Sequence, residues 1–509
     1  SLKWLRDLWP IENREFKKFF PMAFIFCCVL FNYSILRSIK DSLIIVIIGA
    51  EAISFIKLYL TFPTAILFAV IYAKMTNILT QKQIFYCFCF FFLAFFMVFA
   101  FILYPNQDFF HPDPKFIAAL PGKSVSFLGI NIHFAHFKWF ILIFGKWSYA
   151  MFYVFAELWG SMMLSLLFWQ FANSITKTNE AKRFYPMVGF LGNIGLVAAG
   201  QVIKFLSTGG TAKAGKVAVS AANEAFLISS VAWTVSIAIL VLVGLYTYLN
   251  NVVLTDPKFM PISVAKKREK VEMSLIDGLK VVFSSRYLGF IAILLLCYGI
   301  SINLVEGPWK DSVRKAYPTT VQYANFMADL QTYTGIFTML AFFISAQILK
   351  KISWFYGAIL TPLMIAISGL GFFTFLFLNK TSGGSEAIGT LFMALDPLLL
   401  AVFFGFAQNV ASKATKYSFF DPTKEMSYIP VDAELQTKGK AAVDVVAGRL
   451  SKSTGGLLQS TIFILFPAAG FAEVAPYFMI VFAFICLIWL VDVRLLYNEY
   501  RKLVKDEQK

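Results

Sequence analysis

The sequence is short of charge and of long polar stretches, and each shortage excludes a class of protein. Charged residues make up 15% of the 509 residues and hydrophobic residues 59%, whereas about a quarter of an ordinary soluble domain is charged. The length would suit three soluble domains, but no long polar segments separate them. A chain of soluble domains is therefore excluded, and the sequence predicts an all-α protein that crosses a membrane many times.

Cysteine and histidine are too few and too poorly spaced for metal or redox chemistry. The six cysteines lie inside apolar runs, and Cys87 and Cys89 lack the spacing of a CxxC motif. The three histidines share one polar loop, 105–138, which we expect to be solvated. No phosphate-binding loop has the required glycine and lysine spacing. We therefore expect no catalytic residue, no metal site and no cofactor, and the protein is predicted not to be an enzyme.

Long apolar runs are what the sequence does contain. A membrane-spanning helix needs about 20 mostly apolar residues. The first run begins near Phe19, after a basic segment, so we expect no cleavable signal peptide. The fourth run is taken as one span although Lys146 and Glu157 interrupt it. The twelve predicted spans are 19–38, 54–73, 84–104, 139–172, 184–206, 225–249, 287–309, 322–349, 353–378, 390–415, 440–466 and 472–493.

The segment 253–286 divides the chain near its middle. It is the only long polar connection on its side of the membrane, and its end at 272–284 has an amphipathic pattern. Six spans precede it and six follow, which is the layout of a two-bundle carrier. We therefore expect an N-terminal six-helix bundle at 1–252, a cytoplasmic linker with an amphipathic helix, and a C-terminal six-helix bundle at 287–509.

The basic residues predict the orientation of the chain. An even number of spans places both termini on one side of the membrane. The loops of that side hold most of the 45 Lys and Arg residues, so both termini are predicted to be cytoplasmic. This distribution, together with an anionic lipid surface, accounts for most of the net charge of +16. The charge therefore indicates no nucleic-acid partner.

A short motif recurs at equivalent places in the two halves. Lys-Asp-Ser stands at 40–42, at the end of the first span, and at 310–312, at the end of the seventh. Ionisable groups at membrane depth are costly and persist where they face a cavity or a partner. Lys40 and Lys310 are thus either cavity-facing cations or anchors at the interface, whereas Lys57 is expected to be an anchor only.

Two acids and a basic strip extend this polar set. Glu157 lies midway along the fourth span and either pairs structurally or faces a cavity; Glu306, near the end of the seventh span, is either interfacial or part of a site. The eleventh span carries Lys440, Arg449 and Lys452, with few acids nearby to match them. Such a positive strip predicts that the protein binds an anion of several charges.

With these residues in place, the chain resembles a known family. It is similar to the nucleotide transporters of intracellular bacteria and plastids, the ATP/ADP translocases, and looks most like their chlamydial members. The resemblance extends over essentially the whole chain, although loop 105–138 is longer than the family pattern. The resembling stretches are "LRSIKDSLI" (36–44), "FAELWGSM" (155–162), "INLVEGPWK" (302–310), "KATKYSFFDPTKEMSYIP" (413–430) and "KGKAAVDVVAGRLSKSTGG" (438–456).

The resemblance implies a fold, an activity and functional residues. It implies twelve transmembrane helices in a major-facilitator-like fold and exchange of ATP for ADP across a bacterial inner membrane. The functional residues of the family match Lys40, Glu157 and Glu306, and a basic residue of the eleventh span matches Lys440, Arg449 or Lys452. The expected partners are ATP and ADP, with phosphate as a further candidate, and membrane lipids. We expect a monomer.

Three functions are compatible with the residues. In an antiporter, the cations named above, Lys310 included, neutralise the phosphates, and the two acids pair with them between cycles. In a proton-coupled uptake carrier for nucleotides or another organic anion, Glu157 takes the proton. A membrane enzyme or lipid-handling protein would need a catalytic dyad or metal cluster, which the sequence lacks. Arg37 either shares the phosphates or pairs with Asp41, and adenine is expected to stack on an aromatic such as Tyr33, Tyr149 or Tyr153.

Overall fold

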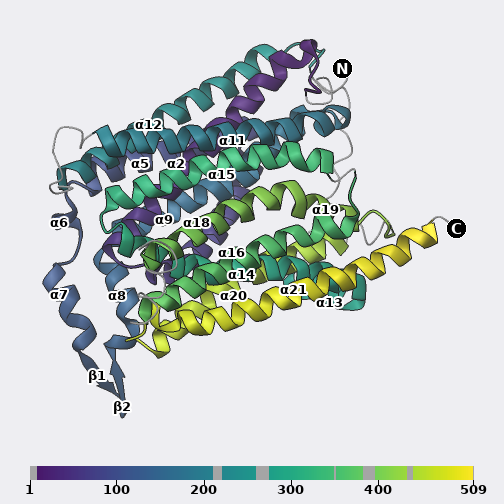
Figure 1. Cartoon of the computed structure of the whole chain (residues 1–509). Helices are drawn as coiled ribbons and strands as arrows, with labels where there is room; N and C mark the ends of the chain where they lie inside the picture. Colours follow the sequence, from purple (N-terminus) through teal and green to yellow (C-terminus); the bar gives the residue numbers. More distant parts are fainter. Residues whose placement is uncertain are drawn as a thin grey trace.

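The computed structural model describes residues 9–209, 221–259, 274–348, 351–381, 396–432 and 439–507. Over these residues the protein is almost entirely helical, and long helices run side by side (Figure 1). The long helical segments are α2 (Phe16–Ile47), α3–η2–α4 (Ala52–Ile78), α5–η3 (Gln81–Leu103), α9–η6–α10 (Trp147–Ile175), α11 (Thr178–Gly209), α12–η7 (Ala221–Val253), α14 (Arg286–Ala316), α15 (Thr320–Ile348), α16 (Trp354–Lys380), α18–η8–α19 (Pro397–Ser427), α20 (Lys440–Leu465) and α21 (Phe471–Glu507).

The helices confirm an all-α polytopic membrane protein. Within the described ranges, eleven helical segments are long and apolar enough to cross a membrane. The remaining long helix, α20, has 26 residues, which is sufficient length for a crossing. It carries Lys440, Arg449 and Lys452 within this length. It occupies the place predicted for the eleventh span.

The fourth predicted span, 139–172, is wrong at its start. The short helix α8 (Lys138–Gly145) ends before Lys146, whose backbone (φ −128°, ψ 43°) is not helical. The crossing segment then runs from Trp147 to Ile175. The Lys146 ammonium donates to Gln107 Oε1 at 3.4 Å, so this polar side chain marks the break between the two helices rather than a point inside one span.

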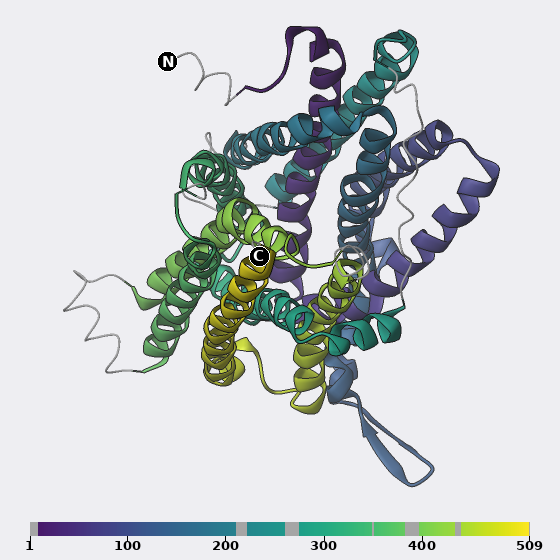
Figure 2. The same cartoon turned by 90° about the vertical axis from the view of Figure 1, so that its right-hand side faces the viewer.

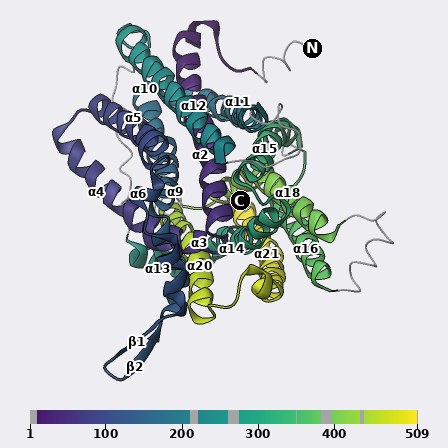
Figure 3. The same cartoon turned by 90° about the vertical axis from the view of Figure 1, so that its left-hand side faces the viewer.

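The first and last long helices show which end of the molecule holds the termini. Helix α2 begins and α21 ends at the right of Figure 1, at what we call the terminal side. The opposite end, the hairpin side, carries a two-stranded antiparallel sheet in which Ser124 pairs with His133 (Figure 3). The hairpin-side elements are α6 (Gln107–Phe110), α7 (Pro114–Ala119), η4 (Leu120–Gly122), β1 (Ser124–Phe127), β2 (Ile130–His133) and η5 (Phe134–Phe137).

Packing is organised around one helix in each half of the chain. Helix α2 packs against α9, α11 and α12, and α14 packs against α18, α20 and α21. Helices α11 and α15 lie along each other and join the two halves (Figure 2). The connection between the halves ends in helix α13 (Leu275–Ser284), which packs on α20. Residues 260–273 of the predicted linker lie outside the described residues.

Polar contacts join the halves at the hairpin side. Glu51 Oε1 accepts a hydrogen bond from the Phe471 amide at 3.1 Å, where α21 begins. The His136 ring donates to the Ile464 carbonyl at 2.7 Å. The chains pack closely here, because a Cβ at Gly470 of the second half would lie 2.9 Å from Glu51 Oε1 of the first.

Ion pairs near the terminal side have a different pattern. In the part of the chain that the structure describes, those at this end each join residues of the same half: Lys18 with Glu180, Arg183 with Glu15, and Lys440 with Glu425. The polar connection between the halves therefore lies toward the hairpin side.

Candidate functional site

Six charged side chains meet inside the bundle, and we call them the ion network. Each one forms at least one ion pair with another member. They come from both halves of the chain, and three are cations and three are acids. Their formal charges therefore cancel. The members are Lys40 and Asp41 on α2, Lys57 on η2, Glu157 on α9, and Glu306 and Lys310 on α14.

Lys40 joins the first span to the fourth. Its Nζ atom lies 2.5 Å from Glu157 Oε1 and 3.3 Å from Asp41 Oδ1. It also lies 4.0 Å above the centre of the Tyr153 ring, a favourable cation–π position. Lys40 is only 2% exposed. An interfacial anchor would extend its ammonium to water, so Lys40 is a buried partner of Glu157 and not an anchor.

Lys310 joins the two halves. Its Nζ atom lies 2.9 Å from Asp41 Oδ2 and 2.7 Å from Glu306 Oε1, one helical turn earlier on α14. Glu306 in turn receives Lys57 from the first half, at 3.6 Å. Lys310 is buried, so it too is not an interfacial anchor. Lys57, which the sequence predicted to be an anchor only, reaches the network from the start of the second span.

The repeated Lys-Asp-Ser motif has one shared role and one divergent role. Ser42 and Ser312 each donate to the carbonyl four residues earlier, at 2.7 and 2.9 Å, which satisfies the hydroxyl inside an apolar helix. The aspartates differ. Asp41 lies between Lys40 and Lys310, whereas Asp311 pairs with Lys315 on its own helix at 2.9 Å. The motif therefore marks equivalent helices but only one of the two acids enters the network.

The residues predicted on the eleventh span lie elsewhere or outside the described side chains. Lys440 begins α20, is 40% exposed, and pairs with Glu425 at 2.6 Å. It therefore does not join the ion network. The side chains of Arg449 and Lys452 lie outside those that the structure describes.

Two further cations lie near the network without an acid partner. Arg37 and Lys413 are half-buried, and no ion pair or hydrogen bond of either side chain occurs among the described residues. The pairing of Arg37 with Asp41 is thus not observed. Sequence reasoning passed over Lys413 because it stands at the end of a span, where lysines are ordinarily anchors.

The aromatic residues proposed for adenine are not equally accessible. Tyr149 is buried and donates to Gln107 at 2.7 Å, and Tyr153 is fully buried beneath Lys40. Both rings are therefore already engaged by residues of the first half and are not open to adenine. Tyr33 is only partly buried and remains the candidate of the three.

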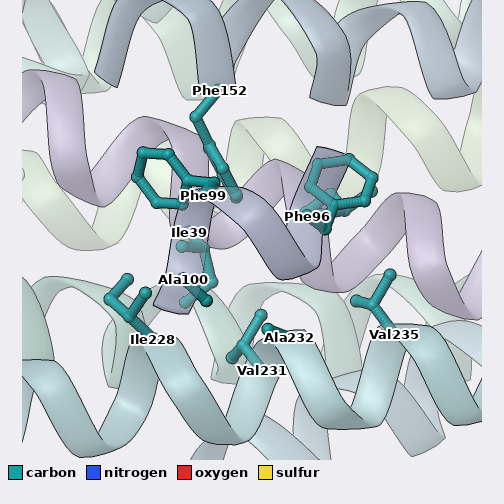
Figure 4. Close-up of a pocket in the computed structure, with 10 residues that line it drawn as sticks. Ile39, Phe96, Phe99, Ala100, Phe152, Ile228, Val231, Ala232 and Val235 are labelled. Atoms are coloured by element: carbon teal, nitrogen blue, oxygen red, sulfur yellow. The ribbon is translucent and has the colours of Figure 1, made fainter. Parts of the chain in front are cut away.

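A separate pocket in the first half has different chemistry. It lies between α2, α5–η3, α9 and α12, and its lining is wholly apolar (Figure 4). Ile39 lines it from α2, and Phe99 and Val231 line it from neighbouring helices. A polyanion has no partner there. No group of His, Cys, Asp or Glu residues suited to a metal ion occurs among the described residues.

Long membrane helices in two halves, with a buried ion network between them, define a secondary transporter of the major facilitator fold. Two solved structures share the fold over 94% of this chain. They are the nucleoside transporter NupG (TM-score 0.51, 12% identity, 98% of its chain) and a D-xylose-proton symporter (TM-score 0.52, 11% identity, 97% of its chain).

The chain belongs to the TLC ATP/ADP transporter family, whose profile matches residues 1–500. Among its relatives, ADP,ATP carrier protein 1 of Rickettsia bellii is 46% identical over 99% of this chain and 97% of its own. ADP,ATP carrier protein 3 of Rickettsia conorii is 42% identical over 98% of this chain and 97% of its own. The resemblance drawn from the sequence is therefore confirmed at the level of the family.

Proposed function

We propose that this protein exchanges ATP for ADP across a membrane by alternating access, without hydrolysing either nucleotide. The observation that carries the proposal is the Lys310–Asp41 ion pair, which ties α14 of the second half to α2 of the first. The pair occurs in a chain of the ATP/ADP transporter family, whose rickettsial members are named ADP,ATP carriers. A carrier that closes on its substrate needs such a contact between its halves.

The ion network supplies a mechanism for exchange. We propose that phosphate groups compete with Glu157 and Glu306 for Lys40 and Lys310, and that the loaded carrier can then separate its halves on the hairpin side. Without a nucleotide, Lys310 returns to Asp41 and Lys57 to Glu306, and these two ion pairs hold the halves together. The empty carrier would then change state slowly, which favours exchange over net leak. Lys440, Arg449 and Lys452 are proposed to add positive charge along α20.

The arrangement in the membrane is part of the same proposal. We place the protein in a bacterial inner membrane with both termini cytoplasmic, because basic loops prefer the cytoplasmic side. The hairpin side then faces outward. The halves 1–252 and 287–509 are proposed to rock against each other, joined by 253–286. The proposed partners are ATP, ADP and membrane lipids, with phosphate as a further candidate. We propose that the protein works as a monomer, is not an enzyme and has no nucleic-acid partner.

One observation favours a second candidate function, proton-coupled uptake. Glu157 is 28% exposed while its partner Lys40 is buried, so a proton can reach this carboxylate. In such a carrier Glu157 would bind the proton that drives entry.

Proteoliposomes separate the two functions. Vesicles that hold purified protein are loaded with ADP, with buffer alone, or with buffer and an inward proton gradient, and entry of labelled ATP is followed. Antiport predicts entry that requires internal ADP and is indifferent to the proton gradient. Entry into vesicles without nucleotide, in proportion to the gradient, would instead establish proton coupling and overturn the exchange proposal.

A further inference from the structure

The ion network itself offers no surplus positive charge to a nucleotide. Its three lysines are matched by three carboxylates, all within ion-pair distance. A phosphate that approaches Lys40 or Lys310 must displace Glu157, Asp41 or Glu306. Because these acids repel an incoming anion, the first favourable contact for a polyphosphate has to come from cations outside the network.

Arg37 and Lys413 are cations of this kind. Arg37 lies on α2, three residues before Lys40 and therefore about 4.5 Å nearer the terminal side along the helix. Lys413 lies near the terminal-side end of α18, in the other half of the chain. Helix α14 packs against both α2 and α18. Glu306 of α14 is within electrostatic range of Arg37 and of Lys413, and the two cations are within electrostatic range of each other.

Holding two unpaired cations together inside a membrane protein is costly. An unmatched charge at membrane depth costs a few kcal/mol even on the mildest scales. Within the described residues no acid forms an ion pair or hydrogen bond with Arg37 or Lys413. Glu306, an acid within electrostatic range of both, is already paired with Lys310 and Lys57. Both side chains are half-buried and not sealed, so an anion can reach them. An anionic ligand would remove the cost and also the repulsion between the two cations.

The neighbouring rings suit a nucleotide and not a simple inorganic anion. Lys416, one turn from Lys413, has its ammonium 5.6 Å from the ring centre of Tyr298 and 5.2 Å from that of Tyr417. Tyr417 is exposed and leaves a ring face free for stacking. Phosphate-binding cations thus lie beside an accessible aromatic surface.

We infer that Arg37 and Lys413 form a polyphosphate-binding pair on the terminal side of the ion network, one cation from each half of the carrier. Arg37 holds phosphate oxygens through its planar guanidinium and Lys413 holds them as a point charge. The pair engages the nucleotide before the network opens. This inference rests on the proposed nucleotide exchange and adds the residues that receive the phosphates first.

Binding of ATP, ADP and AMP to purified protein tests the inference. Arg37→Gln and Lys413→Gln each remove one positive charge. We expect the Kd for ATP to rise about tenfold in each variant, the Kd for ADP to rise less, and that for AMP to change least, because fewer phosphates reach the pair. Arg286→Gln, which removes an exposed arginine at the start of α14, is the matched control and should bind all three as wild type does.

Thermal unfolding without nucleotide separates a binding role from a structural one. Removing an unpaired cation should leave the unfolding midpoint unchanged or raise it, whereas Lys40→Gln, which breaks two ion pairs, should lower it. ATP affinity equal to wild type in both variants, while wild-type protein still exchanges nucleotides, would overturn the inference and leave the proposed function intact. Failure of wild-type protein to bind or exchange any nucleotide would overturn both.

Discussion

The Lys310 ammonium of α14 lies 2.9 Å from the Asp41 carboxylate of α2, and this ion pair connects the two halves of the protein. Asp41 is fully buried and also receives Lys40 at 3.3 Å. One acid therefore serves two lysines from different halves. Because the partners come from helices that must part during transport, Asp41 is where structural stability and the transport cycle depend on the same contact.

Asp41→Asn should destabilise the protein and impair exchange. The amide keeps the shape of the side chain but removes the charge that two buried lysines share, and breaking a buried ion pair from one side costs about 3 kcal/mol or more. We expect a lower thermal unfolding midpoint and at least a roughly tenfold slower ATP/ADP exchange in proteoliposomes.

Asp311→Asn is the matched control for Asp41→Asn. It changes the equivalent acid of the repeated motif, whose partner Lys315 is half-exposed on the same helix. Asp311 is buried, but its partner reaches solvent, so losing this pair should cost less than losing Asp41, whose two lysine partners are both buried. Equal losses of stability in the two variants would mean that the ion pair between the halves contributes no more stability than an ion pair within one helix.

Lys40 and Glu157 should be coupled in stability. Glu157→Gln leaves the buried Lys40 without its partner at 2.5 Å, and Lys40→Gln leaves the partly exposed Glu157 carboxylate without its partner. The double variant leaves neither charge unpaired, so its loss of stability should be smaller than the sum of the single losses by about 1 kcal/mol or more.

The exchange rates of the wild type, the two single variants and the double variant should not follow their stabilities. Exchange needs the cation for phosphate and the acid for release, so both single variants and the double variant should exchange poorly while remaining inserted. The measurements are unfolding midpoints and exchange rates of all four proteins. Additive losses of stability, or wild-type exchange in either single variant, would contradict the assignment of the pair.

Apolar runs were sufficient to predict the fold, because a membrane helix satisfies its own backbone and its length is set by the bilayer. The same reasoning failed at Lys146, where one lysine after a glycine ends a helix without any proline or extended polar stretch. Composition over 20 residues cannot detect a break confined to a single residue, here Lys146.

The candidate site could be predicted in part. Lys40, Glu157, Glu306 and Lys310 were identifiable because charges inside apolar runs are rare and costly. Which acid joins the two halves was not identifiable, since Asp41 and Asp311 stand in the same Lys-Asp-Ser triplet and have different partners. That choice depends on how α2 and α14 approach each other, a relation between distant segments that local sequence does not contain.

The stability of the hairpin side should fall in mild acid through His111. This side chain is buried, and its Nε2 atom lies 2.6 Å from the Ser148 hydroxyl. Burial, and then the nearby Lys146, lower the pKa of His111 to about 4, against the opposing effect of Asp108. A histidine that must stay neutral contributes stability above pH 6.5, its unfolded pKa, and this contribution is lost as the pH falls toward 4.

Unfolding midpoints between pH 7.5 and 4 measure this effect. The difference in midpoint between wild type and His111→Gln should shrink steadily below pH 6.5, because glutamine keeps a hydrogen-bonding side chain without a titrating group. Carboxylates titrate in both proteins and cancel in the difference. A difference that stays constant across this range would show that His111 is not held neutral by the fold.

Glu51 should act as a lock between the halves, through its shape and hydrogen bond and not through its charge. Its Oε1 atom accepts the Phe471 amide at the start of α21, and burial, followed by Asp311, raises the pKa of Glu51. The fold thus favours the protonated form of Glu51. The stability that this preference contributes is lost as the pH rises through the raised pKa, because the carboxyl then becomes charged.

Two substitutions at Glu51 distinguish the hydrogen bond from the charge. Glu51→Gln retains an acceptor for Phe471 and removes the charge, so the hairpin side should remain closed. Glu51→Ala leaves the Phe471 amide, the first of α21, without this acceptor, and its hydrogen exchange should become about tenfold faster. Mass spectrometry of peptides that cover 471–475 measures both variants. Because α21 belongs to the second half and Glu51 to the first, faster exchange in the alanine variant alone would show that this hydrogen bond between the halves, and not the charge, protects the start of α21. Equal exchange in all three proteins would mean that the hairpin side is held closed without Glu51.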